Sequence, residues 1–197
     1  MSELEKQEIS NQNGLNSFNN YGYQIGTQNI YSSYHHFRPI IWNNKIKINE
    51  QRINNQDISK SIGGNSSKIH LAVDSNGNPI EFIISDGTSH DIKIAPDLVS
   101  KLDLTESEIL CADKGYDSDN FRTQIEQTKT KSNIPRKSNT KSNNDHMDWH
   151  IYKIRHLVEN SFCRLKQFRG ISTRYDKLKR NYQSAVALAC IFIWLPL

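Results

Sequence analysis

The sequence predicts an α/β fold, and three observations carry this prediction. The chain has 197 residues, 36% of them hydrophobic, which suffices for one domain with a buried core. The dipeptide Asn76-Gly77 separates two β-type runs, as in a β-hairpin. Helical and strand-like patterns alternate after this hairpin, which is the order typical of α/β proteins.

The expected elements begin after residue 57, each assigned from its hydrophobic period and from the turn residues that flank it. Asp117 or Ser118 would cap the second helix, and Gly170 would end the third. In chain order, we expect strands at 69–73 and 80–85, a helix at 90–102, a strand at 108–112, a helix at 117–128, a strand at 131–135, a basic loop at 137–148, and helices at 147–169 and 178–194.

Residues 1–56 lack these signals. They hold eleven Asn and no Asp, and their aromatic residues follow no sustained period of 2 or 3.6. One strand is a candidate at 38–48. We therefore expect two parts, an irregular or partly disordered segment at 1–56 and a folded domain at 57–197.

The composition disfavours several classes of protein. Three cysteines without metal-like spacing argue against a disulfide scaffold and a zinc module, and suit a reducing cytoplasm. The first ten residues are charged rather than apolar, so no signal peptide is expected. The longest apolar run, 185–197, is shorter than the roughly 20 residues that a membrane-spanning helix needs.

The charge is unevenly distributed along the chain. Residues 131–180 carry thirteen Lys or Arg against four Asp or Glu, a net of +9, whereas the other residues have a net of −5. Such a basic segment favours a polyanionic partner, most simply nucleic acid. The alternative is a solvated basic face without a ligand.

One face of the helix expected at 147–169 carries groups suited to chemistry. At about 100° per residue, Tyr152, Arg155, Glu159 and Lys166 fall within roughly a 60° arc, beside a separate apolar stripe. The carboxylate suits a hard cation, and the two bases suit phosphate oxygens. The alternative is an exposed face held by (i, i+4) pairs such as Arg155 with Glu159.

A second acid, Asp113, follows the apolar strand expected at 108–112. Open α/β sheets place ligand-binding groups at the carboxyl ends of strands, although a lone acid there is also a common turn or cap residue. An acid at a strand end and an acid on a flanking helix together suit a divalent-metal site for phosphodiester chemistry. Two cations roughly 3.5–4 Å apart activate the nucleophile and stabilise the leaving oxygen in such a site.

The spacing Tyr152-x2-Arg155-x3-Glu159-x6-Lys166 resembles the signature of insertion-sequence transposases with a DDE active site. The surrounding sequence resembles the insertion-sequence-five group of the IS4/IS5-like superfamily, from about residue 57 to residue 197. The segments that carry this resemblance are 68–74, 89–91, 112–117, 155–160, 164–169 and 173–178.

This resemblance implies an RNase H-like fold of the retroviral-integrase type and DNA transposition as the function. Asp113 and Glu159 would be catalytic acids and ligands of Mg²⁺ or Mn²⁺, in a two-metal site if the site is complete. Water and then a DNA 3′-hydroxyl would act as nucleophile, giving a cut end and an end joined to target DNA. The residues expected to bind DNA are Tyr152, Arg155, Lys166, Arg136 and Arg164.

The resemblance also implies partners and a location. The partners would be transposon-end DNA, target DNA and, in the active form, further copies of the chain. No membrane would be involved, and the protein would work at the nucleoid in the bacterial cytoplasm.

The chain departs from the family pattern at one point. The family's first catalytic Asp lies on a strand before residues 68–70, where this chain has no Asp ahead of Asp57. A frameshift or recombination upstream of about Asn54 would explain both this loss and the segment without pattern. Asp74 and Asp86 lie near strand ends, but the hairpin places Asp74 in a turn, so neither is assigned to the missing role.

The missing acid leaves two further interpretations open. Metal affinity would fall while Lys and Arg contacts to phosphates persist, so the alternative function is a non-catalytic DNA-binding remnant of a transposase. A third interpretation is a metal phosphohydrolase that uses His90-Asp91. For this dipeptide, the start of a helix at 89–91 is the preferred interpretation.

Overall fold

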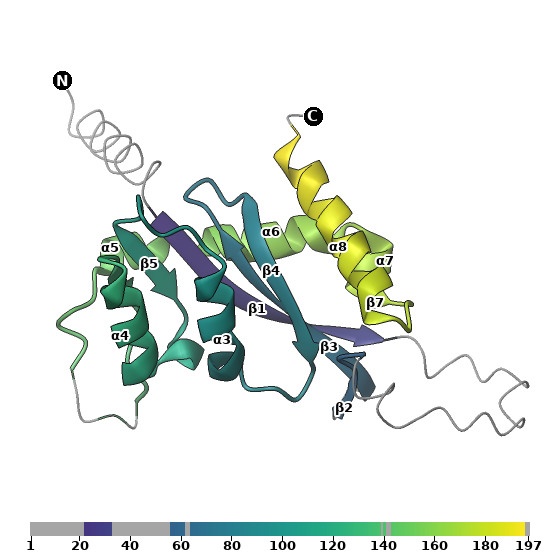
Figure 1. The fold of residues 1–197 in the computed structure, drawn as a ribbon, viewed down its shortest axis with the longest axis horizontal. Coiled ribbons are helices and arrows are strands. Elements are labelled where there is room, and N and C mark those ends of the chain that lie inside the picture. The colour runs from purple at the N-terminus through teal and green to yellow at the C-terminus, as the bar shows by residue number, and fades with distance from the viewer. Residues whose placement is uncertain (1–21, 33–55, 62–63, 139, 141–142, 196–197) are drawn as a thin grey trace, which may run out of the picture.

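The structure is a computed structural model that describes residues 22–32, 56–61, 64–138, 140 and 143–195 (Figure 1). Its strands are β1 (Gly22–Ser32), β2 (Ser59–Ser61), β3 (Gly64–Val73), β4 (Pro79–Asp86), β5 (Ile109–Ala112), β6 (Lys131–Asn133) and β7 (Thr173–Arg174). Its helices are α3 (Asp91–Ser100), η3 (Lys114–Tyr116), α4 (Asp119–Gln127), α5 (Trp149–Lys153), α6 (His156–Lys166), α7 (Arg169–Ser172) and α8 (Lys179–Trp194).

Strand β1 lies at the centre of a mixed sheet. The strand order is β2-β3-β1-β5-β6, and β4 also pairs with β3 while β7 pairs with β1. Strand β1 runs antiparallel to β3, with Gln24 opposite Val73, and parallel to β5, with Gln24 opposite Cys111. The parallel pairing brings the carboxyl end of β5 beside the middle of β1, next to residues that are distant in sequence.

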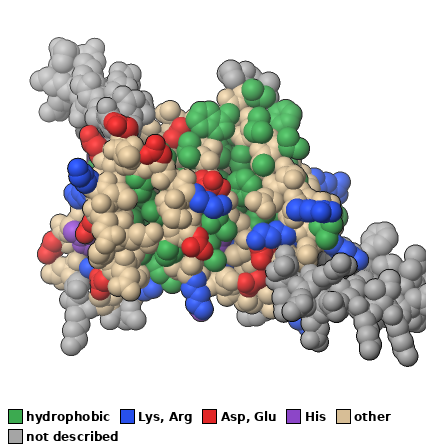
Figure 2. All heavy atoms as spheres, in the orientation of Figure 1, with side chains coloured by type: hydrophobic (Ala, Val, Ile, Leu, Met, Phe, Trp, Pro, Cys, Tyr) green, Lys and Arg blue, Asp and Glu red, His purple; other side chains and the backbone are tan. Residues whose placement is uncertain are grey.

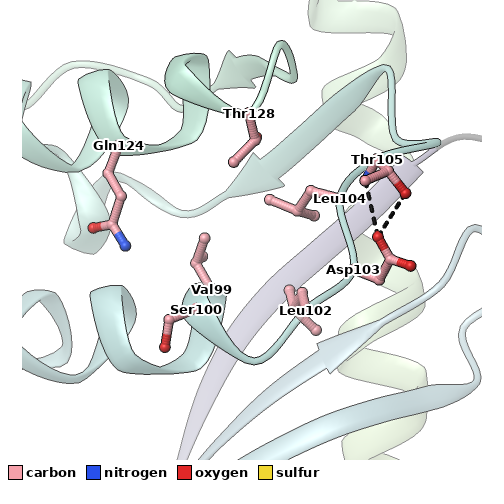
Figure 3. A pocket seen from close by; sticks show the side chains of 8 residues that line it. All are labelled: Val99, Ser100, Leu102, Asp103, Leu104, Thr105, Gln124 and Thr128. Atoms are coloured by element: carbon pink, nitrogen blue, oxygen red, sulfur yellow. Dashed lines mark hydrogen bonds between the residues drawn. The ribbon is translucent and has the colours of Figure 1, made fainter.

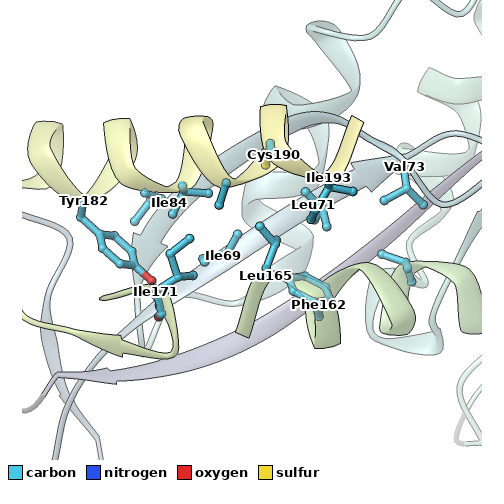
Figure 4. Close-up of a cluster of buried hydrophobic side chains, with 13 residues drawn as sticks. Ile69, Leu71, Val73, Ile84, Phe162, Leu165, Ile171, Tyr182, Cys190 and Ile193 are labelled. Atoms are coloured by element: carbon cyan, nitrogen blue, oxygen red, sulfur yellow. Dashed lines mark hydrogen bonds between the residues drawn. The ribbon is translucent and has the colours of Figure 1, made fainter. Parts of the chain in front are cut away.

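Helices cover both faces of this sheet (Figure 1). Because side chains alternate along a strand, Leu71 and Val73 of β3 face one way and Ala72 faces the other. Leu71 and Val73 join a core with α6, α7 and α8, in which Phe162 and Leu165 are buried (Figure 4). Ala72 belongs to the second core, with Ile25 of β1 and apolar residues of α3, η3 and α4.

Most elements expected after residue 57 are confirmed. Strands β3 and β4 contain the two predicted hairpin strands, and α3, β5, α4, β6 and α8 lie where the pattern places them. Gly77 has φ +81°, a backbone conformation that favours glycine, and Asp74 Oδ1 accepts hydrogen bonds of 2.9 and 2.8 Å from the backbone N–H groups of Asn76 and Asn78. The α/β class predicted from these elements is therefore correct.

The expectation of an irregular N-terminal segment is wrong for residues 22–32, which form the central strand β1. This strand is buried on both faces at Gln24, Ile25 and Gly26, so its sequence shows no alternation of polar and apolar residues. The strand considered at 38–48 lies outside the described residues, and the proposed boundary at residue 56 stays a prediction.

The single helix expected at 147–169 is also wrong, because it is divided into α5, α6 and α7. Between α5 and α6, backbone hydrogen bonds join residues three apart, from Arg155 N to Tyr152 O (3.1 Å) and from Leu157 N to Ile154 O (2.9 Å). This tighter turn lets α5 pack on β5 through Ile151 while α6 packs on β1 and β3. Gly170 lies inside α7 rather than ending a helix.

One side of α8 is apolar and exposed. Leu188, Ile191, Phe192 and Trp194 are each at least half exposed, and hydrophobic side chains gather over this helix in Figure 2. Among the described residues, no helix is long and apolar enough to cross a membrane.

Candidate functional site

Asp113 follows the last residue of β5, at the carboxyl end of that strand. Its backbone is extended, with φ −72° and ψ 161°, and its side chain accepts a 2.7 Å hydrogen bond from the N–H of Lys114. Alternation along β5 places Asp113 on the same face as Ile109 and Cys111, the two residues that pack against α5. The carboxylate therefore leaves the sheet on the side covered by α5 and α6.

A continuous path of contacts joins Asp113 to Glu159 through two side chains. The hydroxyl of Tyr152 donates to Asp113 Oδ1 at 3.5 Å. The guanidinium carbon of Arg155 lies 5.7 Å from the centre of the Tyr152 ring, within cation–π range. Arg155 Nη2 is 2.7 Å from Glu159 Oε1. The structure thus brings these four predicted site residues together on one side of the sheet.

Tyr152 is a neutral hydrogen-bond donor in this setting. Burial raises the pKa of its hydroxyl, the charge of Arg155 opposes this effect, and the charge of Asp113 adds to it. The net pKa shift is upward from an ordinary value that is already well above neutral pH. The phenol consequently keeps its proton and can donate to a carboxylate or to a phosphate oxygen.

The ion pair between Arg155 and Glu159 is only partly shielded. Their side chains are 26% and 54% exposed, so solvent screens the attraction and the pair stabilises the fold by about 1 kcal/mol at most. Glu159 can therefore exchange Arg155 for a different cation at modest cost.

The oxygen donors of this site fit a hard divalent cation in kind but not in number. Carboxylates of Asp113 and Glu159 are the ligands that Mg²⁺ and Mn²⁺ prefer. Among the described residues, however, no three His, Cys, Asp or Glu side chains come together in a way that could hold a metal ion. Two acids alone leave a cation site without a third protein ligand.

Gln24 is a polar residue near this site that the sequence interpretation missed. It is 0% exposed, and neither Oε1 nor Nε2 has a hydrogen-bond partner. Gln24 pairs in register with Cys111 of β5. Gly26, two residues later in β1, lies on the same face of the strand as Gln24. No sequence signal marks Gln24, because it lies in the stretch without pattern.

The remaining predicted DNA-binding residues are placed differently from one another. Lys166 is exposed in the last turn of α6. Arg136 is paired with Asp119 and, at 3.5 Å, with Asp117, while Arg164 Nη2 donates to the backbone oxygen of Ile193 at 2.8 Å. Internal partners thus engage the two arginines, and their proposed role in DNA binding stays a prediction.

The pair His90-Asp91 lies at the start of a helix. His90 is the N-cap residue of α3, and Asp91, in the first turn, forms a 2.9 Å ion pair with Lys68. This arrangement agrees with the preferred interpretation of the dipeptide as a helix start, and the described part of the chain offers no group of three metal-binding side chains there.

A hollow opens on the opposite side of the sheet, between α3 and α4 (Figure 3). Apolar residues such as Val99 and Leu104 line much of it, and its one acid, Asp103, accepts hydrogen bonds from the backbone N–H and hydroxyl of Thr105 (3.1 and 2.6 Å). This hollow shares none of the predicted site residues.

Comparisons with known proteins point to one family. The profile of a family described as "Transposase DDE domain" matches residues 44–194. A protein of Brucella ovis, assigned as a transposase for insertion sequence element IS6501, is 33% identical over 130 residues, which cover 66% of this chain and 98% of that protein. The family match includes Asp113, Tyr152, Arg155, Glu159 and Lys166 and begins after β1.

Proposed function

Because this chain belongs to the family of DDE transposases, we propose that it binds the ends of an insertion sequence and performs divalent-cation-dependent cleavage and strand transfer there. Asp113 and Glu159 are the acids in this proposal. The observation that carries it is the contact path from Asp113 through Tyr152 and Arg155 to Glu159. Tyr152 and Glu159 follow Asp113 by 39 and 46 residues in the sequence, so only the fold brings them to the same site.

The finer assignment is to the insertion-sequence-five group with an RNase H-like domain. The mixed sheet supports this, because β1 is antiparallel to β3 and parallel to β5, and helices cover both faces. The four-residue signature that ends at Lys166 and the sequence segments that flank it support assignment to the insertion-sequence-five group. In the same proposal, an upstream frameshift or recombination replaced the family's first acid.

The residues of this chain have separate roles in the proposed chemistry. Asp113 and Glu159 would hold Mg²⁺ or Mn²⁺, which when bound would lower the pKa of an attacking water and offset charge on the leaving oxygen. Arg155 turns from Glu159 toward a phosphate. A guanidinium can form two parallel hydrogen bonds with phosphate oxygens, as it does with the oxygens of a carboxylate. Tyr152 donates a hydrogen bond to a neighbouring phosphate oxygen, and Lys166 neutralises a second phosphate.

A specific observation favours a second candidate, a DNA-binding remnant without catalysis. Within the described residues, no third His, Cys, Asp or Glu joins Asp113 and Glu159 in a group that could hold a metal ion, and two carboxylates on one site repel each other without a shared cation. DNA affinity depends on Lys and Arg near the phosphates, so it survives the loss of a metal ligand.

One experiment separates the two candidates. The full chain is titrated against labelled duplex from the ends of its own element by fluorescence anisotropy, and nicking of a plasmid carrying those ends is followed in Mg²⁺ and in Mn²⁺. Nicking that is lost in both Asp113→Asn and Glu159→Gln establishes catalysis. Salt-sensitive binding without nicking establishes the remnant, and absence of DNA binding contradicts both.

A second copy of the chain is part of the proposal. The apolar face of α8 offers a surface for it, because Leu188 and Ile191 are 60% and 57% exposed. Sedimentation velocity should show a dimer that Ile191→Glu converts to a monomer, with Glu126→Gln on the exposed side of α4 as a control. If the wild-type chain sediments as a monomer even with bound DNA, the proposed dimer is contradicted.

A further inference from the structure

The buried carboxamide of Gln24 needs an explanation, because it lies in the interior with no partner. The side chain is 0% exposed, and both its oxygen and its nitrogen lack a hydrogen bond. Buried polar groups in folded proteins are nearly always paired, and one left unpaired destabilises the fold. A hydrophobic residue would suit the middle of a central strand better, so the unpaired amide points to a ligand that it can bind.

The position of Gly26 shows which way Gln24 points. A Cβ built on Gly26 would lie 3.0 Å from the γ carbons of Val158, so this face of β1 is turned toward α6. Gln24 is two residues earlier in the same strand and therefore faces the same side. Its register partner Cys111 packs under Ile151 and Ile154, which places Gln24 beneath the junction of α5 and α6.

The same register places Gln24 close to Asp113. Ile25 pairs with Ala112, so the next residues, Gly26 and Asp113, continue side by side on the face that Gln24 shares. Two residues along one strand and one strand across correspond to about 8 Å between the Cα atoms of Gln24 and Asp113. Two side chains that start this far apart can both reach one ion between them.

We infer that the carboxamide oxygen of Gln24 is the third protein ligand of the divalent cation held by Asp113 and Glu159. An amide oxygen is a normal ligand for a hard cation, but it is neutral. The site then carries two negative charges instead of three, and its affinity is correspondingly low. This inference rests on the proposed function and goes beyond it by naming the third ligand and predicting that the site binds metal weakly.

The test measures Mn²⁺ binding directly, from the electron paramagnetic resonance signal of the free ion, with the full chain and no DNA. Gln24→Glu keeps the length of the side chain and adds a charge, so it should raise Mn²⁺ affinity by at least about tenfold. Gln24→Met removes the oxygen at similar volume and should lower the affinity by at least about tenfold. The matched control is Gln124→Met on α4, which changes a glutamine that donates to Pro96 O and should leave Mn²⁺ affinity unchanged.

The outcomes distinguish this inference from the function on which it rests. Affinity that is equal in wild type, Gln24→Glu and Gln24→Met, yet is lost in Asp113→Asn, overturns the role of Gln24 and leaves the two acids in place. Affinity that survives both Asp113→Asn and Glu159→Gln, or no binding by any variant, overturns the metal site itself. Urea unfolding of each variant verifies that it is folded, and Gln24→Glu decides the question if Gln24→Met does not fold.

Discussion

Val158 of α6 packs against Gly26 of the central strand so closely that a Cβ at residue 26 would crowd it. A Cβ on Gly26 would stand 3.0 Å from both γ carbons of Val158 and 3.3 Å from Cε2 of Phe162. The glycine therefore sets the distance between helix and sheet. Glu159 is the residue after Val158, so this distance also sets the position of the carboxylate in the site.

Substitution of Gly26 tests this relationship. Gly26→Ala inserts a methyl group where Val158 must give way, and we expect a loss of about 1–3 kcal/mol in the free energy of unfolding from overpacking. In the double variant with Val158→Ala, the two changes should offset each other by about 0.5–3 kcal/mol, since they share one contact. Urea denaturation of the four proteins measures this coupling, and strictly additive losses would contradict the close packing.

Arg174 connects the backbone of residues 56 and 57, which lead into strand β2, to the core. Its guanidinium is 0% exposed, donates to Ser67 Oγ at 2.6 Å and to Gln56 O at 2.9 Å, and lies 4.8 Å from the ring centre of Tyr182. Arg174→Met should cost about 3 kcal/mol or more in unfolding free energy, because several buried acceptors lose their donor. Exposed Arg180→Met is the control, for which we expect a change within about 0.5 kcal/mol.

The stability of the domain should depend on pH through His70. Burial lowers the pKa of His70 to about 4 from an ordinary 6.5, and its Nε2 lies 2.8 Å from Ser85 Oγ. Between these two values, the unfolded chain binds more protons than the folded one, so stability falls as the pH falls from about 6.5 to about 4. The loss across this window is about 3 kcal/mol at most.

The matched variant isolates this contribution. His70→Gln keeps a polar partner for Ser85 but does not titrate, so its unfolding free energy should change less over the same pH range. Equal pH dependence of wild type and variant in urea titrations would show that other groups are responsible.

Local signals in the sequence predicted the elements that depend on neighbours in the chain. The hairpin of β3 and β4 follows from the turn at Asn76-Gly77, and α3 and α4 follow from their hydrophobic period. Strand β1 has no such signal, because Gln24, Thr27 and Asn29 stand among its apolar residues and its partners lie more than 30 residues away. Pairing with β3 and β5 overrides the weak local preference.

The candidate site was predictable in part for the same reason. Asp113 and Glu159 stand in recognisable local patterns, a strand end and a helix face, and in the fold Tyr152 and Arg155 connect them. Two features of the site could not be predicted without the fold. The tight turn before α6 depends on packing against two different strands. Gln24 becomes a candidate ligand only because it is buried and in register with Cys111.

Lys166 should contribute to DNA affinity without contributing to stability. The side chain is exposed on α6, so Lys166→Gln should change unfolding free energy by no more than about 0.5 kcal/mol. It should weaken DNA binding and reduce the slope of log affinity against log salt by about one. Lys93→Gln, an exposed lysine of α3 on the other face of the sheet, should leave the slope unchanged. If the two variants have equal slopes of log affinity against log salt, the DNA does not contact Lys166 on α6.

Arg155 should have opposite effects on the two ligands. It holds Glu159 at 2.7 Å, and a cation that uses the same carboxylate must displace it. Arg155→Ala frees the carboxylate and removes a positive charge, so we expect Mn²⁺ affinity to rise by up to about fivefold, the equivalent of roughly 1 kcal/mol for a partly exposed pair. The same variant should bind DNA more weakly, because a phosphate loses its guanidinium. Parallel Mn²⁺ and DNA titrations check both directions, and a variant that loses affinity for both ligands would show that Arg155 supports the site only through the fold.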